Sequence, residues 1–301
     1  MTSIAELFNA NNSLERYDVE LLLGEVLNKN SAYLYAHGER KLTCSQNERM
    51  NNYLARLKLN EPVAYLLGEK YFYNIKLNIS NDVLIPRPET ELLVEYALEN
   101  ARTDARILDL GTGSGAIALA LAAASKYSFK VSASDIGDAA LELARKNAHT
   151  NRLDIEFVSS DWFDAIEGEF DLILCNPPYI AEQDVEVEAG VHNFEPHLAL
   201  YSGPDGLRDI RKIIQQAPDH LVKKGTLVIE HGWQQADDVQ DLFDKAGYTH
   251  ITTVKDLAGL QRVTHGNSPR RVESPQRVES LQRVKSLQRV KSLQRAKSLQ
   301  Q

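Results

Sequence analysis

The sequence contains very little cysteine: its 301 residues include only Cys44 and Cys175, which lie far apart. A disulfide framework or a cysteine-based zinc site needs several cysteines at short, regular spacing, so both are excluded. Because intracellular proteins seldom depend on disulfides, so few cysteines lead us to expect a reducing, cytosolic compartment.

Long apolar runs are also absent, although 43% of the residues are hydrophobic. A membrane-spanning helix needs roughly 20 consecutive apolar residues, so the sequence predicts no membrane span. The first residues lack both a basic region and an apolar core, and we expect no secretory signal peptide. The length and the apolar content suffice for one large domain or two modest ones.

The net charge of −8 is the sum of two unlike parts. Residues 267–301 carry nine Lys/Arg and two Asp/Glu, a net charge of +7. Since the whole chain has 34 basic and 42 acidic residues, the first 266 residues carry 25 and 40, a net charge of −15. Such an acidic body argues against nonspecific attraction to a nucleic acid and favours a basic partner.

Residues 267–301 form a basic tail, within which residues 271–300 are five hexapeptides that resemble RVKSLQ. Their apolar positions recur every third residue, a spacing that rotates by about 60° per step around a helix and gives no single apolar face. The pattern fits neither a heptad repeat nor a strand. A disordered extension is the favoured interpretation, and a tail that binds RNA or the ribosome is the alternative.

Three types of pattern divide the rest of the chain. Residues 1–67 have apolar positions at helical spacing and predict a small all-helical domain. Residues 68–85 alternate aromatic and β-branched residues and predict a β-hairpin linker. Residues 86–266 alternate strand and helix patterns, which is typical of an α/β fold with a parallel-type sheet and helices on both faces. Ligands of such sheets bind at the carboxyl ends of the strands.

The α/β segment has well-marked elements. Its predicted strands are residues 107–110, 130–134, 155–158, 172–175, 226–230, 249–254 and 261–264, and its predicted helices are residues 92–98, 116–124, 139–148, 210–217 and 237–246.

A glycine-rich turn follows the first strand of this segment, in the sequence DLGTGSG. Glycines permit a tight turn and a close approach of ligand to backbone. The next strand ends in an acid that can accept hydrogen bonds from both ribose hydroxyls. No P-loop lysine follows, so the pattern predicts a nucleoside cofactor and not a nucleotide triphosphate. The predicted cofactor-binding residues here are Gly111, Thr112, Gly113, Ser114, Gly115 and Asp135.

Asp161 and Trp162 lie just beyond the third predicted strand. The indole and the carboxylate are candidates to line an adenine ring, and the alternative is a partly buried core tryptophan. The fourth strand is followed by Asn176-Pro177-Pro178-Tyr179. Two prolines fix a rigid turn and donate no hydrogen bonds, so the Asn176 oxygen and the Pro177 carbonyl can together hold an NH₂ group.

The glycine loop, the ribose acid and NPPY, in this order, resemble class I S-adenosylmethionine-dependent methyltransferases that act on a planar amino group. NPPY occurs in adenine-N6 and in protein-glutamine-N5 methyltransferases. More of the chain resembles the peptide chain release factor glutamine methyltransferase family. RPETE at residues 87–91 favours this branch over the ribosomal-protein glutamine methyltransferases. The stretches that carry the resemblance are EPVAYLLGEKYFY, LIPRPETELLVE, DLGTGSGAIALAL, SDWF, CNPPYI, FEPHLAL, EHGWQQ and QRVTHG, within residues 1–266.

The resemblance implies a Rossmann-like methyltransferase fold, S-adenosylmethionine as cofactor, and the glutamine of a Gly-Gly-Gln motif in class 1 release factors as substrate. It implies that the helical domain grips a remote part of the factor. We also expect a monomer, no metal, because His192 and His197 have no carboxylate or cysteine partner at metal spacing, and no nucleic-acid substrate, because the body of the chain is acidic. The residues implied at the reacting groups are Asn176, Pro177, Pro178 and Tyr179, with Asn176 also at the cofactor and Arg87 and Glu89 at the substrate.

Three other functions stay open from the sequence. A ribosomal-protein glutamine methyltransferase shares the NPPY pattern. An adenine-N6 nucleic-acid methyltransferase would need a basic groove. A non-catalytic binding protein should have lost an element of the site, and none is missing. The EHGW sequence of residues 230–233 ends a strand on the same side, where it either packs against the site or contacts substrate.

Overall fold

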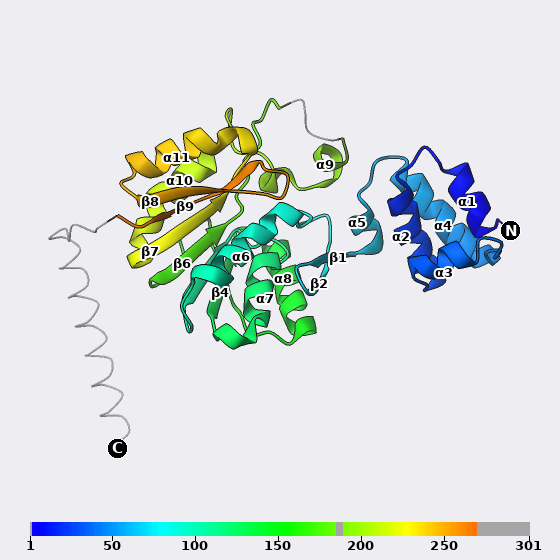
Figure 1. Ribbon diagram of the computed structural model, residues 1–301, viewed down its shortest axis with the longest axis horizontal. Helices are drawn as coiled ribbons and strands as arrows, with labels where there is room; N and C mark the ends of the chain where they lie inside the picture. The colour runs from blue at the N-terminus through cyan, green and yellow to red at the C-terminus, as the bar shows by residue number, and fades with distance from the viewer. Residues whose placement is uncertain (1, 185–188, 270–301) are drawn as a thin grey trace, which may run out of the picture.

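The computed structural model describes residues 2–184 and 189–269, which form a helical unit followed by a seven-stranded sheet with helices on both faces (Figure 1). The hexapeptide repeat of residues 271–300 lies outside the described residues. Within the described ranges, no helix combines the length and the apolar composition that crossing a membrane requires.

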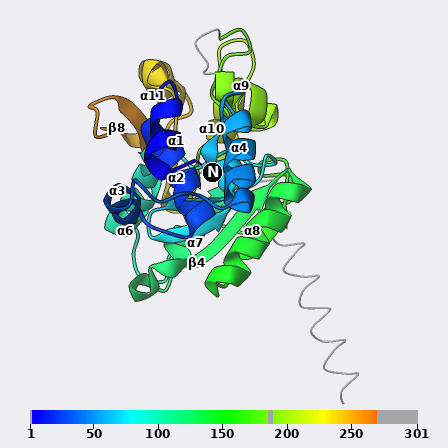
Figure 2. The same ribbon diagram turned by 90° about the vertical axis from the view of Figure 1, so that its right-hand side faces the viewer.

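The helical unit has an apolar core of its own, which includes Leu22, Leu23 and Met50. Capping boxes begin two of its helices at Ser3 and Thr43, where each side chain accepts a hydrogen bond from the third backbone N–H of the helix. Figures 1 and 2 show helices α1 to α4 together at one end of the molecule. The predicted all-helical start is confirmed. The helices are α1 (Ile4–Ala10), α2 (Arg16–Leu27), α3 (Ser31–Ala36), α4 (Cys44–Leu57) and α5 (Val63–Leu67).

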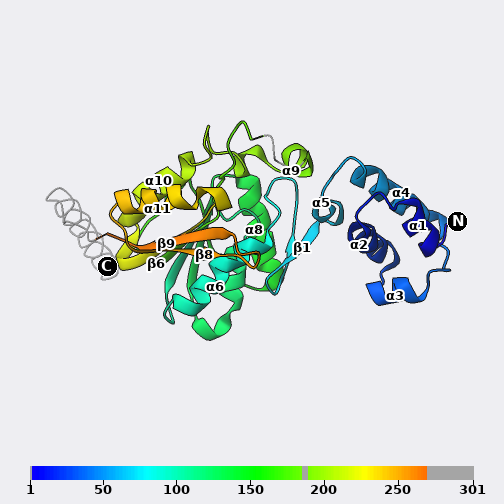
Figure 3. The same cartoon turned by 45° about the horizontal axis from the view of Figure 1, so that its top comes forward.

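The predicted hairpin consists of β1 (Glu69–Phe72) and β2 (Ile75–Asn78) and lies between the helical unit and the main sheet (Figure 3). Asn147, a buried residue of the later helix α8 (Asp138–Asn151), holds the hairpin in place. Asn147 Nδ2 donates to the carbonyls of Asn78 at 3.0 Å and Ser114 at 2.9 Å. One amide therefore joins the hairpin to the glycine loop of the sheet.

The main sheet has the strand order β5-β4-β3-β6-β7-β9-β8. The first five of these are parallel, whereas β9 is inserted antiparallel between β7 and β8. The expectation of a parallel-type sheet is thus wrong for the last two strands. Only residues 256–260 join them, and such a short connection permits antiparallel pairing alone. The strands are β3 (Arg106–Leu110), β4 (Lys130–Asp135), β5 (Glu156–Ser159), β6 (Phe170–Cys175), β7 (Leu221–Glu230), β8 (Thr249–Lys255) and β9 (Gln261–Asn267).

Each face of the sheet is covered by helices that enclose a separate apolar core (Figures 1 and 3). Alternate side chains of a strand point to opposite faces, so Ile107 of β3 lies in the core under α6, α7 and α8, and Leu108 lies in the core under α10 and α11. The helices are α6 (Glu91–Asn100), α7 (Ala116–Ala123), α8 (Asp138–Asn151), α9 (Ala189–Phe194), α10 (Arg208–Gln216) and α11 (Ala236–Lys245).

Candidate active site

The glycine loop between β3 and α7 has two different faces. Gly111, Gly113 and Gly115 all have positive φ, at 76°, 54° and 86°. A Cβ at Gly113 would meet no atom within 4 Å, whereas a Cβ at Gly115 would lie 2.5 Å from Leu119 Cδ1. Gly113 therefore leaves its backbone open to a ligand. Gly115 instead allows close packing of α7, and the structure does not bring it to the site.

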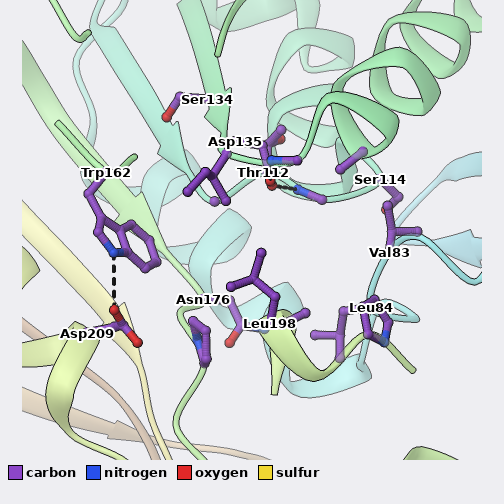
Figure 4. Close-up of a pocket in the computed structure, with 18 of the residues that line it drawn as sticks. Val83, Leu84, Thr112, Ser114, Ser134, Asp135, Trp162, Asn176, Leu198 and Asp209 are labelled. Atoms are coloured by element: carbon purple, nitrogen blue, oxygen red, sulfur yellow. Dashed lines mark hydrogen bonds between the residues drawn. The ribbon is translucent and has the colours of Figure 1, made fainter. Parts of the chain in front are cut away.

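A cavity of about 490 Å³ opens at the carboxyl ends of the parallel strands (Figure 4). The strand ends supply its polar groups, and the loop that contains Val83 and Leu84 supplies apolar side chains on another side. All the predicted cofactor-binding residues except Gly115 line it. They are Gly111, Thr112, Gly113, Ser114, Asp135, Asp161, Trp162 and Asn176.

Asp135, at the end of β4, is held in one orientation. Its Oδ2 accepts from the backbone N–H of Gly113 at 2.8 Å, and its Oδ1 accepts from Gly137 at 2.9 Å. Burial raises the pKa of Asp135, and these backbone donors oppose the rise. Each carboxylate oxygen can accept more than one hydrogen bond, so the side chain retains acceptor sites that face the cavity.

Asp109 supports the glycine loop from within the sheet. It is fully buried, and its Oδ2 accepts from Thr112 Oγ1 at 2.5 Å and from the backbone N–H of Ala118 at 3.1 Å. Its Oδ1 has no hydrogen-bond partner among the described residues. Burial raises the pKa of Asp109 to about 7. The residue stabilises the turn and does not line the cavity.

Trp162 forms one wall of the cavity. Its backbone has a positive φ of 50°, and its Nε1 donates to Asp209 Oδ1 at 3.2 Å (Figure 4). A Cβ at Gly111 would lie 3.4 Å from the indole, so the ring covers the start of the glycine loop. The indole thus lines the cavity and is also partly buried against the core under α10 and α11, so each of the two interpretations from the sequence describes part of its surroundings. At the rim, the neighbouring Asp161 pairs with Lys212 Nζ at 2.9 Å.

Asn176 lies where two cavities meet. It lines the large cavity and also a second one of about 260 Å³, whose lining includes Pro177, Tyr179 and Arg87. The Asn176 Nδ2 donates to Thr90 Oγ1 at 3.0 Å, while its buried Oδ1 has no partner among the described residues. An unpaired buried acceptor is costly unless a ligand completes it. The NPPY turn therefore presents an acceptor between the two cavities.

The backbone of the NPPY turn is supported from behind by two further turns. Gln235 Nε2 donates to the carbonyl of Tyr179 at 2.9 Å. Gly206, with a φ of +73°, approaches the same carbonyl so closely that a Cβ would lie 2.1 Å from its oxygen. The position of Tyr179 is therefore set by contacts with residues far away in the sequence.

The EHGW sequence divides between the core and the surface. Glu230 is 1% exposed, and its Oε1 accepts from the Tyr179 hydroxyl at 3.4 Å. His231 is fully buried, and its ring nitrogens form hydrogen bonds with the Gly232 carbonyl and the Thr264 hydroxyl. Trp233 is 49% exposed. Glu230 thus contacts the site from behind, which the sequence left undecided.

The RPETE sequence contributes two of its side chains. Arg87 lines the smaller cavity and forms an ion pair with the buried Glu195. Glu89 lines neither cavity. In the 3₁₀ turn Pro88–Thr90, successive side chains point in different directions, and it is Thr90 that lines the large cavity. Thr90 was not predicted from the sequence.

Leu198 was also not predicted, although it lines the large cavity and is 64% exposed (Figure 4). Cys175 is fully buried, and burial raises the pKa of its thiol, so the thiol stays protonated and unreactive. No group of three or more His, Cys, Asp or Glu side chains in the described part of the chain is arranged to hold a metal.

Two family models match the chain: the PrmC N-terminal domain over residues 2–68 and the methyltransferase small domain over residues 88–195. The release factor glutamine methyltransferase of Yersinia pestis is 44% identical over 253 residues, 83% of this chain and 91% of that protein. The chain belongs to the release factor glutamine methyltransferase family. The Pseudomonas aeruginosa member is 43% identical over 254 residues, 83% of this chain and 92% of its own.

Solved structures show the Rossmann-like methyltransferase fold in more distant proteins. A methyltransferase from Pyrococcus furiosus aligns with a TM-score of 0.50 and 19% identity, over 73% of this chain and 99% of that one. The hMettl16 catalytic domain, solved in complex with an RNA hairpin of the MAT2A 3′UTR, aligns with a TM-score of 0.52 and 17% identity. The alignment covers 75% of this chain and 82% of that one. These similarities concern the fold alone.

Proposed function

We propose that this protein transfers a methyl group from S-adenosylmethionine to the side-chain amide nitrogen (N5) of the glutamine in the Gly-Gly-Gln motif of class 1 peptide chain release factors. One observation carries this proposal: the unpaired oxygen of Asn176 lies between a cavity with the features of a nucleoside site and a smaller cavity lined by Pro177 and Tyr179. We infer the substrate from the names of the relatives, which are release factor glutamine methyltransferases.

The large cavity fits S-adenosylmethionine in its chemistry. Asp135 offers oriented acceptors for ribose hydroxyls, Trp162 offers a flat apolar face for adenine, and the backbone at Gly113 is open for the methionine part. When bound, this cofactor supplies a methyl group that is already activated on a sulfonium. The protein then has to hold and orient the acceptor nitrogen.

A glutamine amide nitrogen is a poor nucleophile because its lone pair is delocalised into the carbonyl, as in a peptide bond. Asn176 Oδ1 and the Pro177 carbonyl accept its two hydrogens and fix its direction, an effect of orientation that removes several kcal/mol from a barrier. As positive charge develops on the nitrogen, both interactions strengthen, so they favour the transition state over the ground state. The proton leaves after transfer, without a dedicated base.

The smaller cavity suits the proposed substrate in shape. Pro177, Tyr179, Ile180 and Leu200 give it rigid and mostly apolar walls. A glutamine that follows two glycines can enter such a slot because the preceding residues have no side chains to obstruct it. Arg87, fixed by Glu195, adds one cationic group.

Transfer of a labelled methyl group tests the proposal. The full-length protein is incubated with labelled S-adenosylmethionine and, in parallel, a class 1 release factor, its Gly-Gly-Gln Gln→Ala variant, ribosomal proteins, and DNA and RNA that contain adenine. Label confined to the unaltered release factor supports the proposal. Label in ribosomal protein or nucleic acid would indicate the corresponding alternative, and binding of cofactor without transfer would indicate a non-catalytic protein.

We also propose that the protein acts as a monomer in the cytoplasm, where release factors meet the ribosome. Gel filtration with light scattering, with and without the release factor, tests the first part: a mass of one chain alone and of one chain plus one factor together is expected. A stable dimer in the absence of the factor would contradict it.

A further inference from the structure

The backbone of Trp162 has an unfavourable conformation. Its φ of 50° lies in the left-handed region, which a bulky side chain rarely adopts. Such conformations persist only where the surrounding contacts impose them, and they are frequent at ligand sites. The indole covers Gly111 and lines the large cavity. Its orientation therefore depends on contacts with other parts of the chain.

Asp209, in the first turn of α10, makes such a contact with the ring. The Trp162 Nε1 donates to Asp209 Oδ1 at 3.2 Å (Figure 4). An indole has a single hydrogen-bond donor, so this bond determines how the ring is rotated. Asp209 therefore sets which part of the indole faces the cavity.

The carboxylate of Asp209 is itself held by residues other than Trp162. Its Oδ2 accepts from Ser202 Oγ at 2.6 Å and from Arg208 Nη2 at 3.0 Å. The Ser202 Oγ in turn accepts from the backbone N–H of Asp209 at 2.8 Å. Asp209 is 9% exposed and Ser202 is fully buried. With Oδ2 bound by two donors, the carboxylate has one defined orientation, in which Oδ1 faces the indole.

Ser202 extends the connection to the chain that follows the NPPY turn. Its backbone N–H donates to the Ile180 carbonyl at 2.9 Å, and the N–H of Ile180 donates to the Leu200 carbonyl at 2.9 Å. Ile180 comes directly after the NPPY turn, and both Ile180 and Leu200 line the smaller cavity. A continuous series of hydrogen bonds thus leads from Trp162 in the large cavity, through Asp209 and Ser202, to the smaller cavity.

We propose that Asp209 is a positioning residue: it holds the Trp162 indole in the orientation that contacts adenine and, through Ser202, fixes the backbone that follows the NPPY turn. One side chain thereby sets a wall of the cofactor cavity and a wall of the substrate cavity. This inference rests on the proposed function, because it takes S-adenosylmethionine and a release factor glutamine as the ligands of the two cavities.

Two simpler roles are compatible with the location of Asp209. It lines the large cavity, so its carboxylate could contact the cofactor directly. It also lies in the first turn of a helix, where an acidic residue interacts favourably with the helix dipole. Asp237 shares only the second of these features, because it lies exposed in the first turn of α11. D237A is therefore the matched control.

A double-mutant cycle on cofactor binding separates these roles. We expect D209A to raise the Kd of S-adenosylmethionine, measured by calorimetry, about tenfold, and D237A to leave it unchanged. When W162F is already present, D209A should raise the Kd by less than about twofold more, because the indole N–H that it positions is gone. Losses that add in the double variant would indicate direct contact with the cofactor and overturn the proposal, as would equal Kd values in D209A and D237A.

The indole N–H signal of Trp162 tests the contact without any ligand. Nitrogen-15 NMR spectra should contain two indole signals, from Trp162 and Trp233, and W162F identifies them. The Trp162 signal should move to lower proton chemical shift in D209N, because a neutral oxygen accepts a weaker hydrogen bond than a carboxylate, and should move further in D209A. The Trp233 signal should stay in place in both variants. A Trp162 signal that also stays in place would overturn the proposal.

The release factor assay tests the connection to the smaller cavity. At saturating cofactor, D209A should raise the KM of the release factor at least about threefold above that of D237A, because the backbone at Ile180 is held less firmly. Equal KM values would overturn the part of the proposal that concerns Ser202. If the unaltered protein methylates no release factor, while the cycle and the indole signal behave as expected, the proposed function fails and the positioning of Trp162 by Asp209 stands.

Discussion

At Gly206 the chain lies so close to Tyr179 that an added Cβ would come within 2.1 Å of the Tyr179 carbonyl oxygen. The same oxygen accepts a hydrogen bond from Gln235. These contacts fix the backbone of the NPPY turn, and neither Gly206 nor Gln235 lines the two cavities. The precision of the site therefore depends on a residue with no side chain, which lies outside both cavities.

We predict that G206A lowers both stability and activity. The methyl group must displace the Tyr179 backbone, which should cost more than about 2 kcal/mol in the free energy of unfolding, and should reduce kcat because the turn moves. G259A is the control: its φ of +82° imposes a similar backbone strain, of about 1 kcal/mol, and nothing lies within 4 Å of the new methyl group. Equal effects in thermal unfolding and in kcat would contradict the close-contact explanation.

Replacing the acid at the end of β4 tests the assignment of the ribose. D135N substitutes a neutral amide whose NH₂ group opposes the N–H of Gly113 or Gly137. We expect the Kd of S-adenosylmethionine, measured by calorimetry, to rise at least about tenfold. D138N, exposed at the start of α8, should leave it unchanged. If both variants bind alike, Asp135 does not hold the cofactor.

Tryptophan fluorescence can report the occupied cavity, because the chain has only two tryptophans, Trp162 and Trp233. Trp162 lines the large cavity and Trp233 does not. We expect S-adenosylmethionine to change the emission of W233F and to leave that of W162F unchanged. The reverse result would place the adenine away from Trp162.

Two buried carboxyls should make the protein less stable as the pH rises. The pKa of Glu230 is raised from 4.5 to about 7, and that of Asp109 from 3.8 to about 7. At a pH between the ordinary and the raised pKa, the carboxyl is ionised in the unfolded chain and still protonated in the folded chain. The free energy of unfolding therefore falls from pH 5 to pH 8. E230Q should reduce this fall by on the order of 2 to 3 kcal/mol in denaturant titrations. An identical fall in E230Q and in E95Q, at an exposed position of α6, would show that Glu230 is not responsible.

The sequence predicted the local parts of this molecule well. Alternating and helical apolar spacing located every strand and helix after residue 106 except α9 and the short 3₁₀ turns, because those periods reflect burial on one or two faces. The turn residues of the glycine loop and of NPPY predicted many of the residues that line the two cavities, since their backbone requirements are local. Local chemistry alone therefore identified the large cavity.

Features that depend on packing between distant segments could not be predicted. Gly113 and Gly115 look equivalent in the sequence, yet only the folded chain shows that Gly115 faces Leu119 of α7 and Ala144 of α8 and does not face the large cavity. Thr90 and Asn176, which share a hydrogen bond, lie 86 residues apart and meet only in the folded chain. The position of β9, which pairs antiparallel with both β7 and β8, likewise depends on strands that are distant in the sequence.

Single-turnover methylation of a class 1 release factor shows whether Asn176 positions the substrate glutamine. The unaltered protein and N176A are compared at saturating cofactor, and peptide mass spectrometry locates the modified residue. The unaltered protein should add one methyl group to the glutamine of the Gly-Gly-Gln motif. N176A should react about 10²-fold more slowly while it still binds S-adenosylmethionine. A near-normal rate in N176A, or a methyl group on another residue, would contradict the account.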